Sequence, residues 1–149
     1  MLDVEIVKMS VDHLDDIMVV ERLSFSVAWS RDAFIEEITR NRFARYISAK
    51  ANNRIIGYAG MWKVFDEGHI TNIAVHPEYR GKGIGSSLVE ELIKIAKNEG
   101  ITRMTLEVRE SNIAAQRLYS KYGFRKSGIR KAYYADNSEN AIIMWKEFT

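Results

Sequence analysis

The residues of this sequence best suited to chemistry lie in a short glycine-rich stretch, RGKGIGS, at residues 80–86. Its three glycines let the backbone approach a ligand without interference from Cβ atoms, while Arg80 and Lys82 add positive charge at the rim. A helix is predicted to start at the glycines, so its first N–H groups and the positive end of its dipole face the same point. The stretch is therefore predicted to bind an anion, most naturally a phosphate.

The spacing of the glycines does not fit the common nucleotide loops. A P-loop would place Ser or Thr after the lysine, but Lys82 is followed by Gly83. A dinucleotide loop would start directly after a strand and would have its third glycine one residue later than Gly85. The alternative to a binding loop is a plain glycine-rich connection, although three alternating glycines are entropically costly for a mere turn.

Other side chains are candidates for moving protons. In the strand expected at residues 102–108, apolar residues alternate on one face and Glu107 projects from the other, either into solvent or into a cleft. Tyr119 belongs to an aromatic stripe at helical spacing, which is more typical of a core than of chemistry. Glu67 and His69 flank the start of an expected central strand and are competing bases that would act through water, unless they serve only the turn.

The helices and strands that position these residues are indicated by periodicity and by turn signals. Ser10 and Ser30 are suitable N-caps for two early helices, and Trp29 and Phe34 are spaced for a hydrophobic staple at the second. A third helix is expected from Gly85 to a stop at Gly100, and a fourth between a Ser111 cap and Gly123. Strands are expected at residues 3–9, 44–50, 54–65, 69–75 and 102–108, followed by two more joined near residues 136–140.

These elements follow one another in the order βααβββαβαββ. Strands joined both by hairpins and by helices indicate an α+β protein with a mixed central sheet flanked by about four helices. The length of 149 residues fits a single domain, residues 1–149.

Composition and charge narrow the functional classes. With 22 Lys and Arg against 20 Asp and Glu, the chain lacks the basic surplus of a nucleic-acid-binding protein, so no direct nucleic acid binding is expected. The absence of cysteine excludes disulfides, thiolate metal sites and cysteine nucleophiles, and no metal site is predicted. No signal sequence and no apolar run of the ~20 residues that span a bilayer is present, so a cytoplasmic protein without membrane attachment is expected.

Arg80, Gly83 and Gly85 fit the pattern [QR]-x-x-G-x-[GA], and in this respect the sequence resembles the GNAT family of acyl-CoA-dependent N-acetyltransferases. The stretches at residues 106–124 and 129–145 extend the resemblance to the RimI-like subgroup of ribosomal-protein alanine N-acetyltransferases. The resemblance covers most of the chain and implies the GNAT fold, which has the strand and helix order given above. It also implies acetyl-CoA as co-substrate, with no metal.

The resemblance implies roles for individual residues. Glu107 would be the general base, and Tyr119 the general acid that returns a proton to the thiolate. Trp29, Tyr133 and Tyr134 would bind the acceptor, although Ala28 stands before Trp29 where the subgroup commonly has proline. Residues along the pantetheine arm and around the pyrophosphate would be Ile73, Ala74, Val75, Arg80, Gly81, Lys82, Gly83, Ile84, Gly85, Ser86 and Asn112.

The expected activity is acetylation of a protein N-terminus, Ala or Ser in type, on a small-subunit ribosomal protein. A free α-amino group has a pKa near ~8, against ~10.4 for lysine, so a carboxylate base suffices at neutral pH. A small-amine acetyltransferase and a non-catalytic acyl-CoA-binding module remain alternatives. The first would favour a strongly acidic pocket, for which the sequence shows no dense acidic run, and the second would not need both Glu107 and Tyr119.

Overall fold

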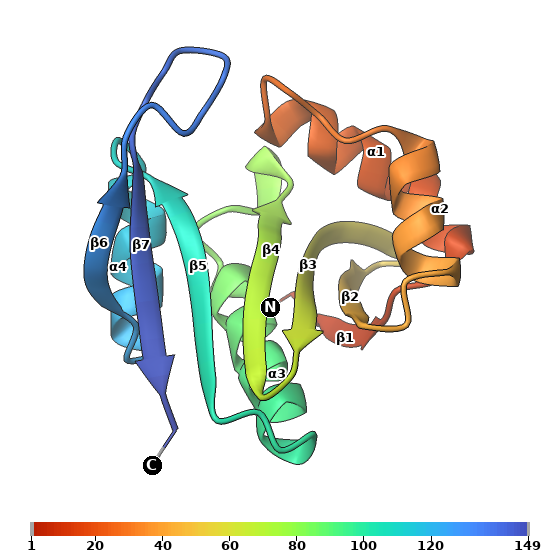
Figure 1. Ribbon diagram of the computed structural model, residues 1–149. Helices are drawn as coiled ribbons and strands as arrows, with labels where there is room; N and C mark the ends of the chain where they lie inside the picture. The colour runs from red at the N-terminus through yellow and green to blue at the C-terminus, as the bar shows by residue number, and fades with distance from the viewer. Residues whose placement is uncertain (1, 149) are drawn as a thin grey trace.

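The computed structural model describes residues 2–148, which form a mixed β-sheet with helices on both faces (Figure 1). The predicted order of elements is confirmed. Two 3-10 helices, Val11–His13 and Pro77–Tyr79, precede α1 and follow β4. The helices are α1 (Leu14–Ser24), α2 (Arg31–Thr39), α3 (Ile84–Asn98) and α4 (Ile113–Lys121); the strands are β1 (Glu5–Lys8), β2 (Ala44–Ala51), β3 (Arg54–Val64), β4 (Glu67–Val75), β5 (Arg103–Arg109), β6 (Arg125–Arg130) and β7 (Ala141–Glu147).

In the described chain the strands form a seven-stranded sheet in the order β1-β2-β3-β4-β5-β7-β6. The predicted meander of β2, β3 and β4 is antiparallel, whereas β4 and β5 are parallel because α3 crosses over between them. Strand β7 lies between β5 and β6 and pairs antiparallel with both.

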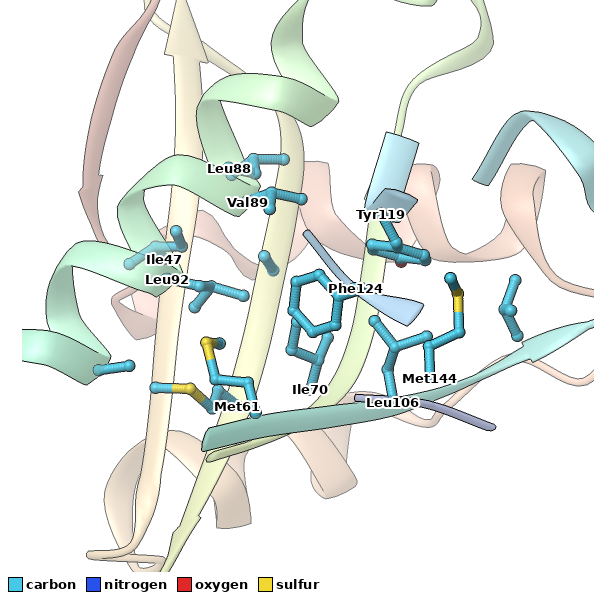
Figure 2. Close-up of a cluster of buried hydrophobic side chains, with 14 of the residues drawn as sticks. Ile47, Met61, Ile70, Leu88, Val89, Leu92, Leu106, Tyr119, Phe124 and Met144 are labelled. Carbon is cyan, nitrogen blue, oxygen red and sulfur yellow. The ribbon is translucent and has the colours of Figure 1, made fainter. Parts of the chain in front are cut away.

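Two hydrophobic clusters hold the helices on the sheet. Helices α1 and α2 cover one face through residues such as Ile17 and Phe34. Helices α3 and α4 cover the other face, where Leu88, Tyr119 and Phe124 belong to the larger cluster shown in Figure 2. Each helix therefore buries its apolar stripe against the strands, as its periodicity predicts.

The central strand β4 carries one extra residue. Gly60 of β3 lies opposite Asn72, and the next residue, Met61, lies opposite Ile70, so Thr71 forms a β-bulge. The Tyr46 hydroxyl lies 3.0 Å from the Thr71 hydroxyl, and the Tyr46 ring crosses β3 at Gly60, where there is no side chain. A glycine and an aromatic ring on neighbouring strands thus stabilise the bulge.

The parallel pairing of β4 with β5 is short. Among residues 2–148 the two strands are paired only where residues 67–69 face residues 103–105. The bulge follows two residues after His69, and beyond it β4 and β5 diverge toward their carboxyl ends (Figure 1). One edge of β4 is consequently free of a neighbouring strand from Ile70 to Val75.

Of the three predicted N-caps, Ser30 is confirmed, whereas Ser10 is the N-cap of the 3-10 helix Val11–His13 and His13 that of α1. The Ser30 hydroxyl accepts a hydrogen bond from the Ala33 N–H at 3.1 Å, and Trp29 packs on Phe34 with 5.4 Å between ring centroids. The predicted Ser111 cap of α4 is wrong. Asn112, the residue directly before the helix, is the cap and accepts from the Ala115 N–H at 3.1 Å, while the Ser111 N–H donates to the Glu139 carboxylate at 2.6 Å.

Replacement of Gly60 by alanine should destabilise the fold by about 1–3 kcal/mol, the usual cost of overpacking, because the new Cβ would overlap the Tyr46 ring. Gly128→Ala in β6 is the matched control, since a Cβ there would lie 3.7 Å from Ile143, an ordinary contact. Urea unfolding measures both variants. Equal stability of the two variants would show that Tyr46 does not pack over Gly60.

Candidate active site

A cavity of about 410 Å³ opens where β4 and β5 have diverged. It brings together the end of β4, the glycine-rich loop and the first turns of α4. Ten of the predicted site residues line it: Ile73, Ala74, Val75, Arg80, Gly81, Gly83, Ile84, Gly85, Asn112 and Tyr119.

A larger apolar hollow of about 660 Å³ lies elsewhere, at the start of β2 and the end of β3, and includes Phe43, Trp62 and Phe65. None of the predicted site residues lines it. We therefore take the cavity between β4 and α4 as the candidate active site.

The glycine-rich loop has the geometry of an anion site. Gly81 and Gly83 have φ values of 77° and 81°, and Gly83 is the N-cap of α3, so the turn requires a conformation that other residues adopt only with strain. The first N–H groups of α3 therefore point out of the helix end toward the cavity. Lys82 is exposed and lies outside the cavity lining, as does Ser86 in the first turn of α3.

Arg80 and Gly85 serve the loop in different ways. The Arg80 guanidinium donates to the Val75 carbonyl at 3.0 Å and to the Ser24 hydroxyl at 3.3 Å, which fixes a positive charge at the end of β4. A Cβ on Gly85 would lie 3.2 Å from Leu118, so this glycine allows α3 to approach α4 closely. The third glycine therefore serves helix packing, a role that the spacing alone did not indicate.

Tyr119 reaches the cavity from α4. Its side chain is 8% exposed, and its ring packs against Phe124 with 5.9 Å between centroids (Figure 2). Burial, with a smaller contribution from Tyr134, raises the pKa of Tyr119 above its ordinary value of 10. The phenol consequently holds its proton at neutral pH, as a proton donor must.

Glu107 lies on β5 beyond the point where β4 and β5 separate. Met104, Leu106 and Val108 are buried, and the Glu107 side chain is 31% exposed on the opposite face, as the alternation predicts. Its carboxylate accepts a hydrogen bond from Arg130 at 3.2 Å.

Tyr134 is half-buried in the loop between β6 and β7. Burial raises the pKa of Tyr134 to about 12; Arg109 opposes this rise, while Tyr133 and then Glu107 add to it. The Arg109 guanidinium lies 3.9 Å from the centre of the Tyr134 ring, which places this ring against β5. Tyr133 packs edge-on against Tyr134 at 5.1 Å and is half exposed.

The competing bases lie at the other end of β4. The Glu67 carboxylate is hydrogen-bonded to His69 at 3.0 Å and paired with Arg103 at 2.9 Å, in the segment where β4 and β5 are still paired. These contacts lower the pKa of Glu67, chiefly through the His69 hydrogen bond. Neither residue lines the cavity, and neither does Glu107; they differ in that Glu107 lies at the open end of β4 and β5, where the two strands are no longer paired.

Comparison with known proteins shows the family of this chain. Residues 14–124, most of the chain, match the model of the acetyltransferase (GNAT) family. This chain belongs to the GNAT family. As a GNAT protein it is an acetyl-CoA-dependent N-acetyltransferase.

Curated GNAT relatives match nearly the whole chain. The [ribosomal protein bS18]-alanine N-acetyltransferase of Haemophilus influenzae is 41% identical over 130 residues, which are 84% of this chain and 86% of that protein. The Escherichia coli K12 protein of the same name is 36% identical over 129 residues and covers 84% of each chain.

Solved GNAT structures superpose closely on this chain. The ribosomal-protein-S18-alanine N-acetyltransferase from Escherichia coli has a TM-score of 0.89 at 31% identity and covers 99% of this chain and 95% of its own. The PaiA N-acetyltransferase from Thermoplasma acidophilum, in complex with coenzyme A, has a TM-score of 0.84 at 25% identity and covers 98% and 99%.

The residues of this GNAT cavity fit acetyl-CoA. The loop at the start of α3 suits the pyrophosphate, and the free edge of β4 offers backbone N–H and C=O groups for the amides of the pantetheine arm. Within residues 2–148 no helix is long and apolar enough to cross a membrane, and no three His, Asp or Glu side chains are grouped to hold a metal ion.

Trp29, like Tyr133 and Tyr134, lies outside the cavity lining of this GNAT protein. Its ring packs on Phe34, so any influence on the acceptor would pass through the backbone of the loop between α1 and α2. Sequence reasoning also missed Ser24 and Phe25, which line the cavity from the end of α1. The sequence held one weak signal for a cavity at this helix end: a small residue, Ser24, directly before the apolar Phe25.

Gly83→Ala should weaken acetyl-CoA binding, because alanine disfavours the φ of 81° and would turn the N–H groups away from the phosphate. Loss of one hydrogen bond to a charged group costs roughly 1.5–3 kcal/mol, so the Kd should rise about tenfold or more. Titration calorimetry measures this directly.

Gly100→Ala is the matched control for Gly83→Ala. Gly100 ends the same helix with a φ of 75°, and an added Cβ would meet no described atom within 4 Å at either position. Both variants should lose similar stability, but only Gly83→Ala should lose affinity. Equal losses of affinity would contradict the assignment of the loop.

Proposed function

We propose that the protein transfers the acetyl group of acetyl-CoA directly to the α-amino group of a protein N-terminus, with Glu107 as general base and Tyr119 as general acid. The observation that carries this proposal is that Tyr119 lines the cavity together with the start of α3, while Glu107 lies on β5 just beyond its last pairing with β4, where Arg130 holds its carboxylate. Residues 1–149 would form a single catalytic domain.

In this reaction acetyl-CoA supplies an acyl thioester, and the chain supplies proton transfer and orientation. Glu107 accepts the proton that the amine loses as the N–C bond forms, and Arg130 orients its carboxylate. Tyr119 donates its hydroxyl proton to the sulfur as the C–S bond breaks. The buried phenol is suited to this step because it stays protonated until the thiolate appears beside it.

The acceptor we propose is the N-terminus of a ribosomal protein, with Ala or Ser as its first residue. Two relatives with high coverage are named for alanine acetylation of ribosomal protein bS18. Tyr133 and Tyr134 would form an aromatic wall beside Glu107 for the incoming peptide. Such an acceptor is synthesised in the cytoplasm, where we place the enzyme.

A peptide panel tests the acceptor. Peptides that differ in their first residue, each matched by an Nα-blocked, lysine-containing control, are incubated with acetyl-CoA, and mass spectrometry locates the acetyl group. Acetylation confined to free α-amines, strongest for Ala or Ser, is expected. Acetylation of lysine in the blocked peptides, or of small amines alone, would contradict the proposal.

Glu107→Gln should lower kcat by about 10²-fold or more, the contribution of a positioned general base, while leaving the fold intact. Tyr119→Phe should lower kcat similarly, because phenylalanine keeps the buried ring but cannot return a proton to the thiolate. Glu67→Gln is the control, since it removes the rival base at the paired end of β4. A loss of kcat in Glu67→Gln with normal turnover in Glu107→Gln would reverse the assignment.

A further inference from the structure

Arg109 makes four contacts with one loop. It follows Glu107 on the same face of β5, and its guanidinium pairs with Asp136 at 2.9 Å and with Glu139 at 3.2 Å. It also lies over the ring of Tyr134, 3.9 Å from the centroid, and 3.3 Å from the Asn137 amide oxygen. All four partners belong to the loop at residues 131–140, between β6 and β7.

The 131–140 loop needs such an anchor. Ala132 and Ser138 have φ values of 51° and 57°, which cost energy in residues other than glycine and persist only where surrounding contacts impose them. Four hydrogen bonds lie within the loop, among them one from the Ala132 N–H to the Asn140 amide oxygen at 3.0 Å and one from the Ser138 N–H to the Tyr134 carbonyl at 2.8 Å. The ion pairs with Arg109 add the contacts that attach this loop to β5.

The ion pair between Arg109 and Asp136 also contacts the loop between α1 and α2. The Ser26 hydroxyl, in the loop between α1 and α2, donates to the Asp136 carboxylate that Arg109 binds. The neighbouring Phe25 lines the cavity. Arg109 and Asp136 thus join the two loops that flank the carboxyl ends of β4 and β5 (Figure 1).

We propose that Arg109 is a positioning residue for the acceptor: it holds Tyr134 beside Glu107 and ties the 131–140 loop to the loop after α1. This inference rests on the proposed function, because it assigns Tyr134 to the acceptor side. Lysine cannot replace Arg109, since only the planar guanidinium can stack on a ring while its forked N–H groups bind two carboxylates.

Arg103 provides a matched control on the same strand. It lies six residues before Arg109 on the same face of β5, pairs with Glu67 and Glu147, and covers the ring of Trp145 at 4.2 Å. The two arginines therefore have the same kinds of partner. They differ in place, because Arg103 lies at the paired end of β4 and β5 and Arg109 at the open end.

The test compares Arg109→Lys with Arg103→Lys by steady-state kinetics and hydrogen exchange. Arg109→Lys should raise the KM for an Ala-first peptide at least about tenfold, in line with the cost of small misplacements near a reacting centre. The KM for acetyl-CoA should not change. The amides of Tyr134 and Ser138 should exchange faster in Arg109→Lys, while Arg103→Lys should match the wild type in both readouts and lose similar thermal stability.

Ser26→Ala provides a second variant that does not endanger folding, because Ser26 is exposed. It should raise the peptide KM less than Arg109→Lys does. A peptide KM that is unchanged in Arg109→Lys, or that rises equally in Arg103→Lys, would overturn the inference. Failure of the wild type to acetylate any free N-terminus would instead contradict the proposed function, and hydrogen exchange would still decide whether Arg109 holds the loop.

Discussion

The separation of β4 from β5 is the constraint on which the rest of the structure depends. A parallel pair with full pairing would leave no free strand edge, and α4 would have no cavity to face. The bulge at Thr71 bends β4 away after His69, and Tyr46 and Gly60 hold the bulge in place. The free edge of β4, the cavity and the approach of α4 follow from this one extra residue.

The charged side chains of the proposed site form two groups. At one end the first turn of α3 and Arg80 form a positive pole that suits a pyrophosphate. Toward β5, Glu107, Arg109 and Arg130 are arranged with carboxylates and tyrosines around the place where an amine would enter. In the proposed function the anionic donor would lie in the cavity, and the acceptor amine would approach from the β5 side, next to the cavity lining.

Local signals explain which features the sequence could predict. Three predicted features depend only on residues close together in the sequence, and all three are confirmed: the turn at Gly81 and Gly83, the helix α3, and the alternation around Glu107. Ser111 is not the cap because the helix begins one residue later than predicted, at Ile113, so that Asn112 precedes it. The Ser111 N–H instead binds Glu139, 28 residues away, a partner that no short pattern contains.

Other features depend wholly on pairing across the fold. The bulge at Thr71 requires the register of β3 against β4, and the partners of Arg109 lie 25 to 30 residues further along the chain. Tyr119 shows the limit most clearly. Its apolar stripe predicts a core residue, and it is indeed buried, yet the same side chain lines the cavity because β4 has turned away from β5.

The most direct test of this account is a crystal structure of the protein with coenzyme A and an Ala-first peptide. The account predicts the pyrophosphate at the start of α3, the sulfur beside Tyr119, and the peptide amine between Tyr134 and Glu107. Coenzyme A bound away from the free edge of β4, or a peptide amine beside Glu67 and His69, would contradict it.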